Sequence, residues 1–228
     1  MVPIKSLFAK RGFPLSLDAF KACGASYSQF GEDMIVASLF DKESPCGYYL
    51  DLGCYHPLRW SNTYHFYRRG WSGLSVDASG AFQGLWKKHR PRDIHWVYAV
   101  TPTSLHYVSD YVESEEFPAT NYCQVASGNQ AEFLNQNKKT KMKSLSISEL
   151  SERWPFPSKP SIVTTDLEGL DFEIWKSFPF AVFEPKVLIL ENHDINLSES
   201  LSSHMQDNGY ELYGQSGPSL IYHLRKWN

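Results

Sequence analysis

The chain has 228 residues, of which 22 are Lys or Arg and 25 are Asp or Glu, so its formal net charge is -3. This length fits a single α/β domain over residues 1–228, and the charge argues against a nucleic-acid backbone or an anionic membrane as the main partner. No run approaches the ~18 apolar residues that a membrane span needs, and the four cysteines show no C-x-x-C spacing. We therefore expect reduced thiols, no membrane span and a cytoplasmic protein.

The first part of the chain predicts a lead-in followed by one helix. In residues 1–25, basic side chains interrupt short apolar pieces, which is unlike the continuous apolar core of a secretory signal. The polar and acidic segment 26–33 then leads into 34–40, whose apolar spacing indicates a helix. Two interpretations of the side chains in 26–33 stay open, namely helix capping and ligand binding.

An apolar run at 48–53 predicts a buried strand that ends in Asp51-x-Gly53, and Pro57 prevents an immediate helix. The carboxyl edge of an open α/β sheet is where such proteins bind ligands. There Gly53 would let the backbone approach a cofactor closely, and Asp51 could hold a cationic or hydroxylated group. Many α/β proteins carry this pattern, so the functional interpretation depends on partners elsewhere in the chain.

A second acid follows at a suggestive distance. After a helix that begins at Ser61 or Asn62, the strand 74–77 ends in Asp77. Asp77 comes 24 positions after Gly53. In a Rossmann-type sheet, an offset of about 20 residues places a carboxylate on a ribose diol. A carboxylate that merely caps the next helix is the alternative.

The rest of the chain continues to alternate helices and strands. The expected elements are a helix at 81–89, a strand at 94–100, a short helix from 145 capped by Ser146 or Ser148, a strand at 161–166, a helix at 170–178, a strand at 186–191, a helix at 198–208, and a hairpin of 210–213 with 220–224. Such alternation implies parallel strands with right-handed crossovers. The stretch 101–143 lacks clear periodicity, and we interpret its basic run as a solvated loop.

Acidic residues end four of the predicted strands at one edge of the sheet. They are Asp51, Asp77, Asp166 with Glu168, and Glu191 with His193 and Asp194. Converging carboxylates are costly unless a cation, a shared proton or hydroxyl donors satisfy them. A methyl donor with a sulfonium, an ammonium and a ribose meets this demand, and so does a nicotinamide dinucleotide. The turn at 53–57 lacks the G-x-G-x-x-G that holds a pyrophosphate, which favours the phosphate-free donor.

Seven short motifs occur in a fixed order along the chain. They are Ser28-Gln29-Phe30-Gly31-Glu32-Asp33, Asp51-Leu52-Gly53 with Pro57, Ser61-Asn62-Thr63, Gly70-Trp71-Ser72-Gly73, Asp77, Arg90-Pro91 and Asp166-Leu167-Glu168-Gly169. In this order they resemble the FkbM-type S-adenosylmethionine-dependent methyltransferases over residues 26–224. The resemblance implies a Rossmann-like class I methyltransferase fold, with a mostly parallel seven-stranded sheet, an antiparallel last strand and helices on both faces. Cys54 departs from the common Ala, and Tyr98-Ala99-Val100 offers no amide or carboxylate for the adenine amine.

The spacing, the resemblance and the chemistry of the strand ends together assign two sets of residues. The cofactor-binding set is Gln29, Glu32, Asp51, Gly53, Ser61, Asn62, Asp77 and Ala78. The catalytic set is His193, Glu168, Asp166 and Glu191. Asp51 and Gly53 would seat the methionine end of the donor and Asp77 its ribose, whereas His193 is the best base by type at neutral pH. The same oxygen ligands could instead hold Mg²⁺ and acidify the acceptor.

The expected reaction is therefore S-adenosylmethionine-dependent O-methylation of a hydroxyl group, most readily that of a deoxyhexose or glycan. An aromatic content of 15% suits stacking on sugar faces. A polyketide or other small-molecule hydroxyl is the first alternative. An NAD(P)-dependent oxidoreductase and a non-catalytic Rossmann-like binding module are the others. The sequence does not predict an oligomeric state.

Overall fold

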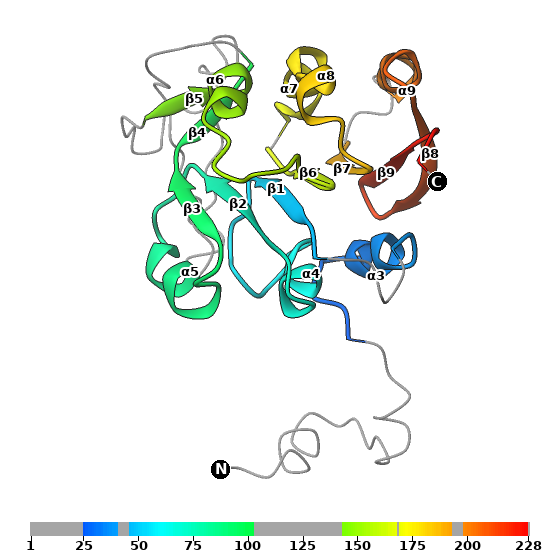
Figure 1. Cartoon of the computed structure of the whole chain (residues 1–228). Coiled ribbons are helices and arrows are strands. Elements are labelled where there is room, and N and C mark those ends of the chain that lie inside the picture. Colours follow the sequence, from blue (N-terminus) through cyan, green and yellow to red (C-terminus); the bar gives the residue numbers. More distant parts are fainter. Residues whose placement is uncertain (1–24, 41–45, 103–142, 168, 193–197, 228) are drawn as a thin grey trace, which may run out of the picture.

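The computed structural model describes residues 25–40, 46–102, 143–167, 169–192 and 198–227. Its centre is a seven-stranded sheet in the order β3-β2-β1-β6-β7-β9-β8 (Figure 1). The strands are β1 Tyr48–Leu52, β2 Ser72–Asp77, β3 Ile94–Val97, β6 Ile162–Thr165, β7 Val187–Glu191, β8 Tyr210–Ser216 and β9 Ser219–Leu224. Neighbours from β3 to β7 are parallel, whereas β9 runs antiparallel to both β7 and β8. This is the Rossmann-like class I methyltransferase fold, as predicted.

Helices cover both faces of the sheet (Figure 1). They are α3 Glu32–Ala37, α4 Tyr64–Arg68 and α5 Gln83–His89 on one face, and α6 Ile147–Glu152, α7 Asp171–Ser177, α8 Phe180–Phe183 and α9 Ser198–Asp207 on the other. Alternate residues of β1 explain how both layers are held, because successive side chains of a strand point to opposite faces. Tyr49 packs in a cluster with Val36 and Phe66, while Leu50 packs in a second cluster with Trp175. Each face therefore has its own apolar core.

The predicted third strand differs from the structure. The expected strand 94–100 stops at Val97, and β4 (Ala99–Thr101) instead pairs in parallel with β5 (Ser144–Ser146) in a separate two-stranded sheet. A backbone hydrogen bond of 2.9 Å from Tyr98 N to the Asp77 carbonyl ends the pairing with β2, after which Ala99 N donates to Lys143. The interruption redirects the chain away from the main sheet.

Two predicted helix starts have different outcomes. Ser146 is confirmed as the N-cap of α6, since it forms a capping box with Glu149. The prediction that Ser61 or Asn62 is the N-cap of α4 is wrong, because the helix begins one residue later, after Thr63. The Ser61 hydroxyl nevertheless accepts a hydrogen bond of 3.1 Å from Tyr64 N, so it satisfies one of the first donors of the helix.

None of the helices in the described ranges combines the length and the apolar character that a bilayer crossing requires. Nearly all of the predicted lead-in at 1–25 and of the loop at 101–143 lies outside the described residues.

Candidate functional site

The carboxyl edge of the sheet brings the predicted acids to neighbouring strand ends. Asp51 lies one residue before the end of β1, Asp77 ends β2, and Asp166 directly follows β6. Backbone hydrogen bonds of 2.8 Å and 2.9 Å join Gly53 to β2 and Asp166 to β1. Glu191 ends β7, the next strand of the sheet. The structure therefore gathers these four acids along one edge, where open α/β sheets bind ligands.

Gly53 has a structural requirement that the sequence did not reveal. Its φ is +78°, and a Cβ atom built on it would lie 1.8 Å from the Asp166 carbonyl oxygen. Only glycine fits such an approach in the left-handed region of backbone conformation. The missing side chain of Gly53 therefore lets the backbone after β1 approach the backbone after β6. This contact fixes Asp166 beside the turn that follows β1.

Asp51 is a buried carboxylate, and one of its two oxygens accepts a hydrogen bond. Its Oδ2 accepts a hydrogen bond of 2.5 Å from the Thr63 hydroxyl, and within the described residues Oδ1 has no hydrogen-bond partner. Burial raises the pKa of Asp51 to about 6, although the positive charge of Arg90 and the hydrogen bond from Thr63 oppose this rise. A buried acid with a free oxygen is a suitable seat for a cationic or donor group of a ligand.

A buried arginine organises the surroundings of Asp51. The Arg90 side chain is completely inaccessible, and its Nε donates to Asp93 Oδ2 at 2.6 Å. Its Nη2 donates to the hydroxyls of Tyr49 (2.8 Å) and Thr63 (2.9 Å). Because Thr63 accepts from Arg90, its own proton is directed to Asp51. Arg90 and Thr63 thus form a relay that holds the carboxylate of β1 in place.

The sequence placed Arg90 in a motif but gave it no role. The Arg90-x-x-Asp93 spacing was the available signal, although it cannot distinguish a buried pair from a solvated one. The structure supplies that information, because the guanidinium also lies 4.5 Å from the ring centroid of Trp86. The same burial explains why so many of its donors have acceptors.

The two predicted cofactor residues after the β1 turn have different positions. Ser61 is buried, and its hydroxyl accepts a hydrogen bond from Arg90 Nη1 at 3.1 Å, so it helps to hold the guanidinium in place. Asn62 is half-buried, and its Nδ2 donates to the Thr164 hydroxyl at 3.0 Å. Thr164 is the register partner of Asp51 across β1 and β6. Asn62 therefore contacts β6 beside Asp51, whereas Ser61 contacts Arg90.

Asp77 is held by the backbone on both sides. One carboxylate oxygen accepts from Tyr55 N at 2.8 Å and the other from Ser79 N at 2.7 Å. Burial raises the pKa of Asp77, and these two hydrogen bonds oppose the rise. Ala78, the other predicted residue here, is half-buried at the end of β2. The turn after β1 and the end of β2 are therefore joined through this carboxylate.

Aromatic side chains line the loop that Asp77 anchors. Tyr55 and Trp60 both have left-handed backbone conformations, with φ of 44° and 56°. Their rings stack 5.8 Å apart, and Phe82 meets the Tyr55 ring edge-on at 5.0 Å. His56 is a turn residue whose Nδ1 accepts two backbone N–H groups, and burial lowers its pKa. Non-glycine residues in this region of φ and ψ are strained, and such strain gathers at ligand-binding loops.

The acids of the 26–33 motif organise a loop instead of capping α3. The N-cap is Gly31, without a side-chain hydrogen bond. Asp33 is buried and accepts from the hydroxyls of Ser26 (2.6 Å) and Ser28 (2.9 Å). Glu32 accepts from Phe30 N at 2.8 Å and from a hydroxyl of β9 at 2.9 Å. Gln29 is exposed. Glu32 is therefore engaged within the protein, while Gln29 faces solvent.

A further acid near Asp166 was missed by the sequence analysis. Asp171, the first residue of α7, is buried, and its Oδ2 accepts from Leu167 N at 3.1 Å. Its Oδ1 is buried and has no hydrogen-bond partner among the described residues. Burial raises the pKa of Asp171 to about 6, and the negative charge of Asp166 adds to this. Its position five residues after Asp166 was the only signal in the sequence.

Part of the predicted catalytic set lies outside the described residues. These residues are Glu168 and His193, together with Asp194. Asp166 is exposed and Glu191 is half-buried. Within the described ranges, no group of three or more His, Cys, Asp or Glu side chains is arranged to hold a metal ion. The predicted cofactor residues Asp51, Gly53, Ser61, Asn62, Asp77 and Ala78 therefore lie on the β1 and β2 side of the described site, whereas Gln29 and Glu32 belong to the segment that contacts β9.

Comparisons with known proteins give likenesses to solved structures, among them the following two. No protein-family model and no curated protein matches the sequence. A TehB-like SAM-dependent methyltransferase from Corynebacterium glutamicum is 11% identical, with a TM-score of 0.44 over 96% of this chain and 97% of the other. TnmH is 12% identical, with a TM-score of 0.38 over 97% of this chain, and this chain covers 61% of TnmH.

Proposed function

We propose that this protein is an S-adenosylmethionine-dependent O-methyltransferase that acts on a hydroxyl group, most readily of a sugar. One observation carries the proposal. Asp51 and Asp77 end adjacent parallel strands, β1 and β2, at the carboxyl edge of a class I methyltransferase sheet. The motif order that resembles the FkbM-type enzymes supports the same activity.

The residues present fit a donor that carries an ammonium and a ribose. Asp51 offers an oxygen without a hydrogen-bond partner in the described part of the chain, and its ionised form attracts a cation. Asp77 keeps acceptor capacity after its two backbone hydrogen bonds, as a ribose diol requires. We assign Asp51 and Gly53 to the methionine end, Asp77 and Ala78 to the ribose, and Asn62 to the same strand edge. The donor, when bound, supplies an electrophilic methyl group on a sulfonium.

In the proposed reaction, the acceptor oxygen forms a bond to the methyl carbon as the bond from that carbon to sulfur breaks. The hydroxyl proton must pass to a base, because the pKa of an alcohol lies far above neutral pH. The ends of β6 and β7 supply candidates, namely Asp166, Glu168, Glu191 and His193. Asp171 joins this set because its buried Oδ1 has no hydrogen-bond partner within the described ranges. Mg²⁺ held by some of these oxygens is an alternative means of acidifying the acceptor.

The acceptor assignment has a separate support. Tyr55, Trp60 and Phe82 form an aromatic group in the loop bonded to Asp77, and Trp60 is 48% exposed. Exposed aromatic rings beside polar groups suit a ligand with one apolar and one hydroxylated face, such as a sugar. A polyketide hydroxyl meets the same requirement and is the second acceptor class.

A nicotinamide dinucleotide fits the turn after β1 poorly. The first helix after this turn, α4, begins only at Tyr64. No helix N-terminus therefore follows the turn directly, although pyrophosphate sites use one. An oxidoreductase and a non-catalytic binding module remain alternatives for the experiment to test.

Calorimetry with S-adenosylmethionine and with NADH tests the proposal. We expect heat with the first and none with the second. Asp77→Asn should weaken donor binding by about tenfold or more, because a charge-assisted hydrogen bond to the ribose is lost. Glu173→Gln, at an exposed acid of α7, is the matched control and should bind like the wild type.

The acceptor is then sought with labelled donor and a panel of free and nucleotide-linked deoxyhexoses and glycans, with the methyl group located by mass spectrometry. Methylation of a hydroxyl supports the proposed reaction. The absence of heat with the sulfonium donor, or binding of NADH in its place, would overturn the proposed function.

A further inference from the structure

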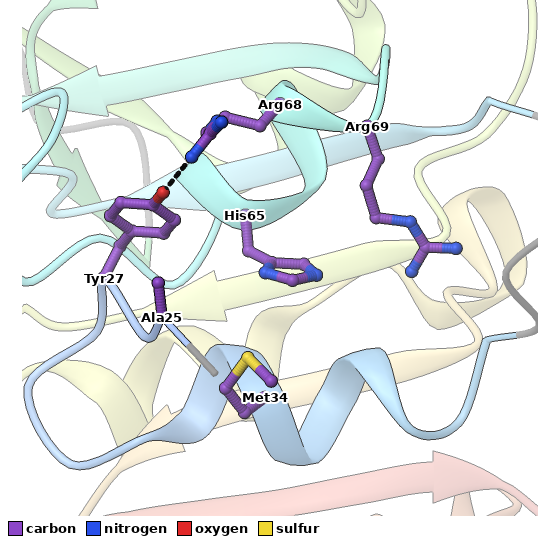
Figure 2. A pocket seen from close by; sticks show the side chains of 6 residues that line it. All are labelled: Ala25, Tyr27, Met34, His65, Arg68 and Arg69. Carbon is purple, nitrogen blue, oxygen red and sulfur yellow. Dashed lines mark hydrogen bonds between the residues drawn. The ribbon is translucent and has the colours of Figure 1, made fainter. Parts of the chain in front are cut away.

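A pocket of about 390 Å³ opens between α3 and α4. It is lined by Ala25, Tyr27, Met34, His65, Arg68 and Arg69 (Figure 2). Three of these side chains are basic and none is acidic, although the whole chain has a net charge of -3. None of them belongs to the strand ends that carry the acids of the proposed donor site. The local charge therefore favours an anion, which the acidic edge would repel.

The basic groups present hydrogen-bond donors to the pocket. Arg68 donates one N–H to the Tyr27 hydroxyl, and within the described residues its other donors have no acceptor. His65 is half-buried, and in the same part of the chain neither of its ring nitrogens has a hydrogen-bond partner. Figure 2 shows His65 between the side chains of Arg68 and Arg69. Polar nitrogens gathered in this way are what an oxyanion with several acceptor oxygens requires.

The opposite wall of the pocket is apolar. Met34 is 38% exposed there, and the Tyr27 ring is fixed by an edge-on contact with Tyr64 at 4.7 Å. The volume lies within the range of about 300–1,000 Å³ that is typical of small-molecule sites. A bare inorganic anion would leave this wall unused, whereas a ligand with an organic body would cover it.

We propose that this pocket binds an organic phosphate, with its phosphate group on Arg68, Arg69 and His65 and its organic part against Tyr27 and Met34. Guanidinium groups suit phosphate because their planar donors match its oxygens in pairs. The site is separate from the proposed donor site, so it can be tested without S-adenosylmethionine.

Calorimetry with uridine diphosphate, pyrophosphate and uridine tests the proposal on the wild-type protein. Uridine diphosphate should bind, its affinity should fall as NaCl is raised, and uridine should not bind. Arg68→Gln should weaken the binding of uridine diphosphate by about tenfold, because a charge-assisted hydrogen bond is lost. Arg153→Gln replaces an exposed arginine at the end of α6 and should leave it unchanged.

The pH dependence of sulfate binding provides a second readout, because sulfate keeps its charge near neutral pH. Burial and the charges of Arg68 and Arg69 lower the pKa of His65, and Asp33 on α3 opposes them. A bound anion favours protonated His65, so sulfate affinity should rise as the pH falls from about 7.5 to about 5.5. His65→Gln should remove this dependence.

Three results would overturn the proposal. The first is that uridine diphosphate does not bind to the wild-type protein, whether or not sulfate does. The second is that uridine binds as tightly as uridine diphosphate, which would remove the role of the phosphate. The third is that Arg68→Gln binds uridine diphosphate as the wild type does. The Arg68 side chain is exposed, so this variant is expected to keep the fold, and circular dichroism checks that it does.

Discussion

Replacing Asp51 by Asn should stabilise the unliganded protein while abolishing donor binding. Asp51 is 6% exposed, and its pKa is raised to about 6, mainly by burial. In an unfolded chain the pKa of Asp is about 3.9. Folding therefore forces a charged group at neutral pH into surroundings that favour its neutral form. Asn keeps the size and an oxygen for the Thr63 hydroxyl without this charge.

The size of the effect follows from the pKa. Each pKa unit corresponds to about 1.4 kcal/mol, so a rise of about two units costs about 3 kcal/mol of unfolding free energy above pH 6. Because the folded pKa is the higher one, the folded state binds more protons between about pH 4 and pH 6, and stability increases as the pH falls through this range. The attraction of Arg90 already lowers this pKa and is therefore included in the rise of about two units, so the expected gain of Asp51→Asn near pH 7.5 is about 3 kcal/mol.

Urea unfolding near pH 7.5 and near pH 5 measures this gain. The wild type should have a larger unfolding free energy at the lower pH. In Asp51→Asn, the part of this difference that comes from protonation of Asp51 should be absent. Asp171, whose pKa is also raised to about 6, should keep its own share in the variant. Calorimetry should show that wild-type affinity for S-adenosylmethionine falls about tenfold for each pH unit below 6. A variant that is less stable than the wild type near pH 7.5, or that shows the wild-type dependence on pH, would refute this reasoning.

Three further substitutions test the architecture around the site. Gly53→Ala should cost about 3 kcal/mol or more in urea unfolding, because the methyl group meets a carbonyl oxygen at 1.8 Å in a left-handed turn. Gly84→Ala is the control, because this position of α5 is open, and it should stabilise the protein by up to about 1 kcal/mol. Equal effects of the two substitutions would contradict the packing argument. Arg90→Met should cost about 3–5 kcal/mol of unfolding free energy because it leaves Asp93 as an uncompensated buried charge. The double variant Arg90→Met with Asp93→Asn should lose at least about 1 kcal/mol less than the two single variants lose together. Simple additivity would argue against an interaction between the two residues. Ser219→Ala should cost about 1–3 kcal/mol, since it removes a hydroxyl donor from a buried carboxylate of α3; faster amide hydrogen exchange in residues 26–31 would report the loosened loop, and unchanged exchange would exclude this role.

The acids of the site could be located from the sequence because their positions depend on local pattern. A strand that ends in Asp51-x-Gly53, followed by another that ends in Asp77, places both acids at one edge once the strands are parallel. The structure confirms this parallel pairing between β1 and β2. The break at Tyr98 could not be predicted, since residues 94–100 contain no Gly or Pro and only the pairing partners end the strand.

Arg90 shows why the rest of the site required coordinates. Its acceptors include Tyr49, Thr63 and Asp93, which come from different segments of the chain. No periodic pattern brings such residues together, because their proximity arises from the crossover of α4 and α5 over the sheet. The same holds for Gly53, whose close neighbour Asp166 directly follows β6 and lies more than a hundred positions later.

The loop before α3 is fastened by the last hairpin of the chain. The Ser219 hydroxyl reaches Glu32 across 187 positions, the Ser216 hydroxyl donates to the Phe30 carbonyl, and the Phe30 ring lies against Gly217. During synthesis on the ribosome, this loop therefore cannot form these contacts until β8 and the start of β9 have emerged. A nascent chain released before β9 would carry every acid of β1, β2 and β6 and still lack the finished segment 26–31. The conformation of this segment therefore depends on a hairpin that is synthesised long after the strands that carry the acids.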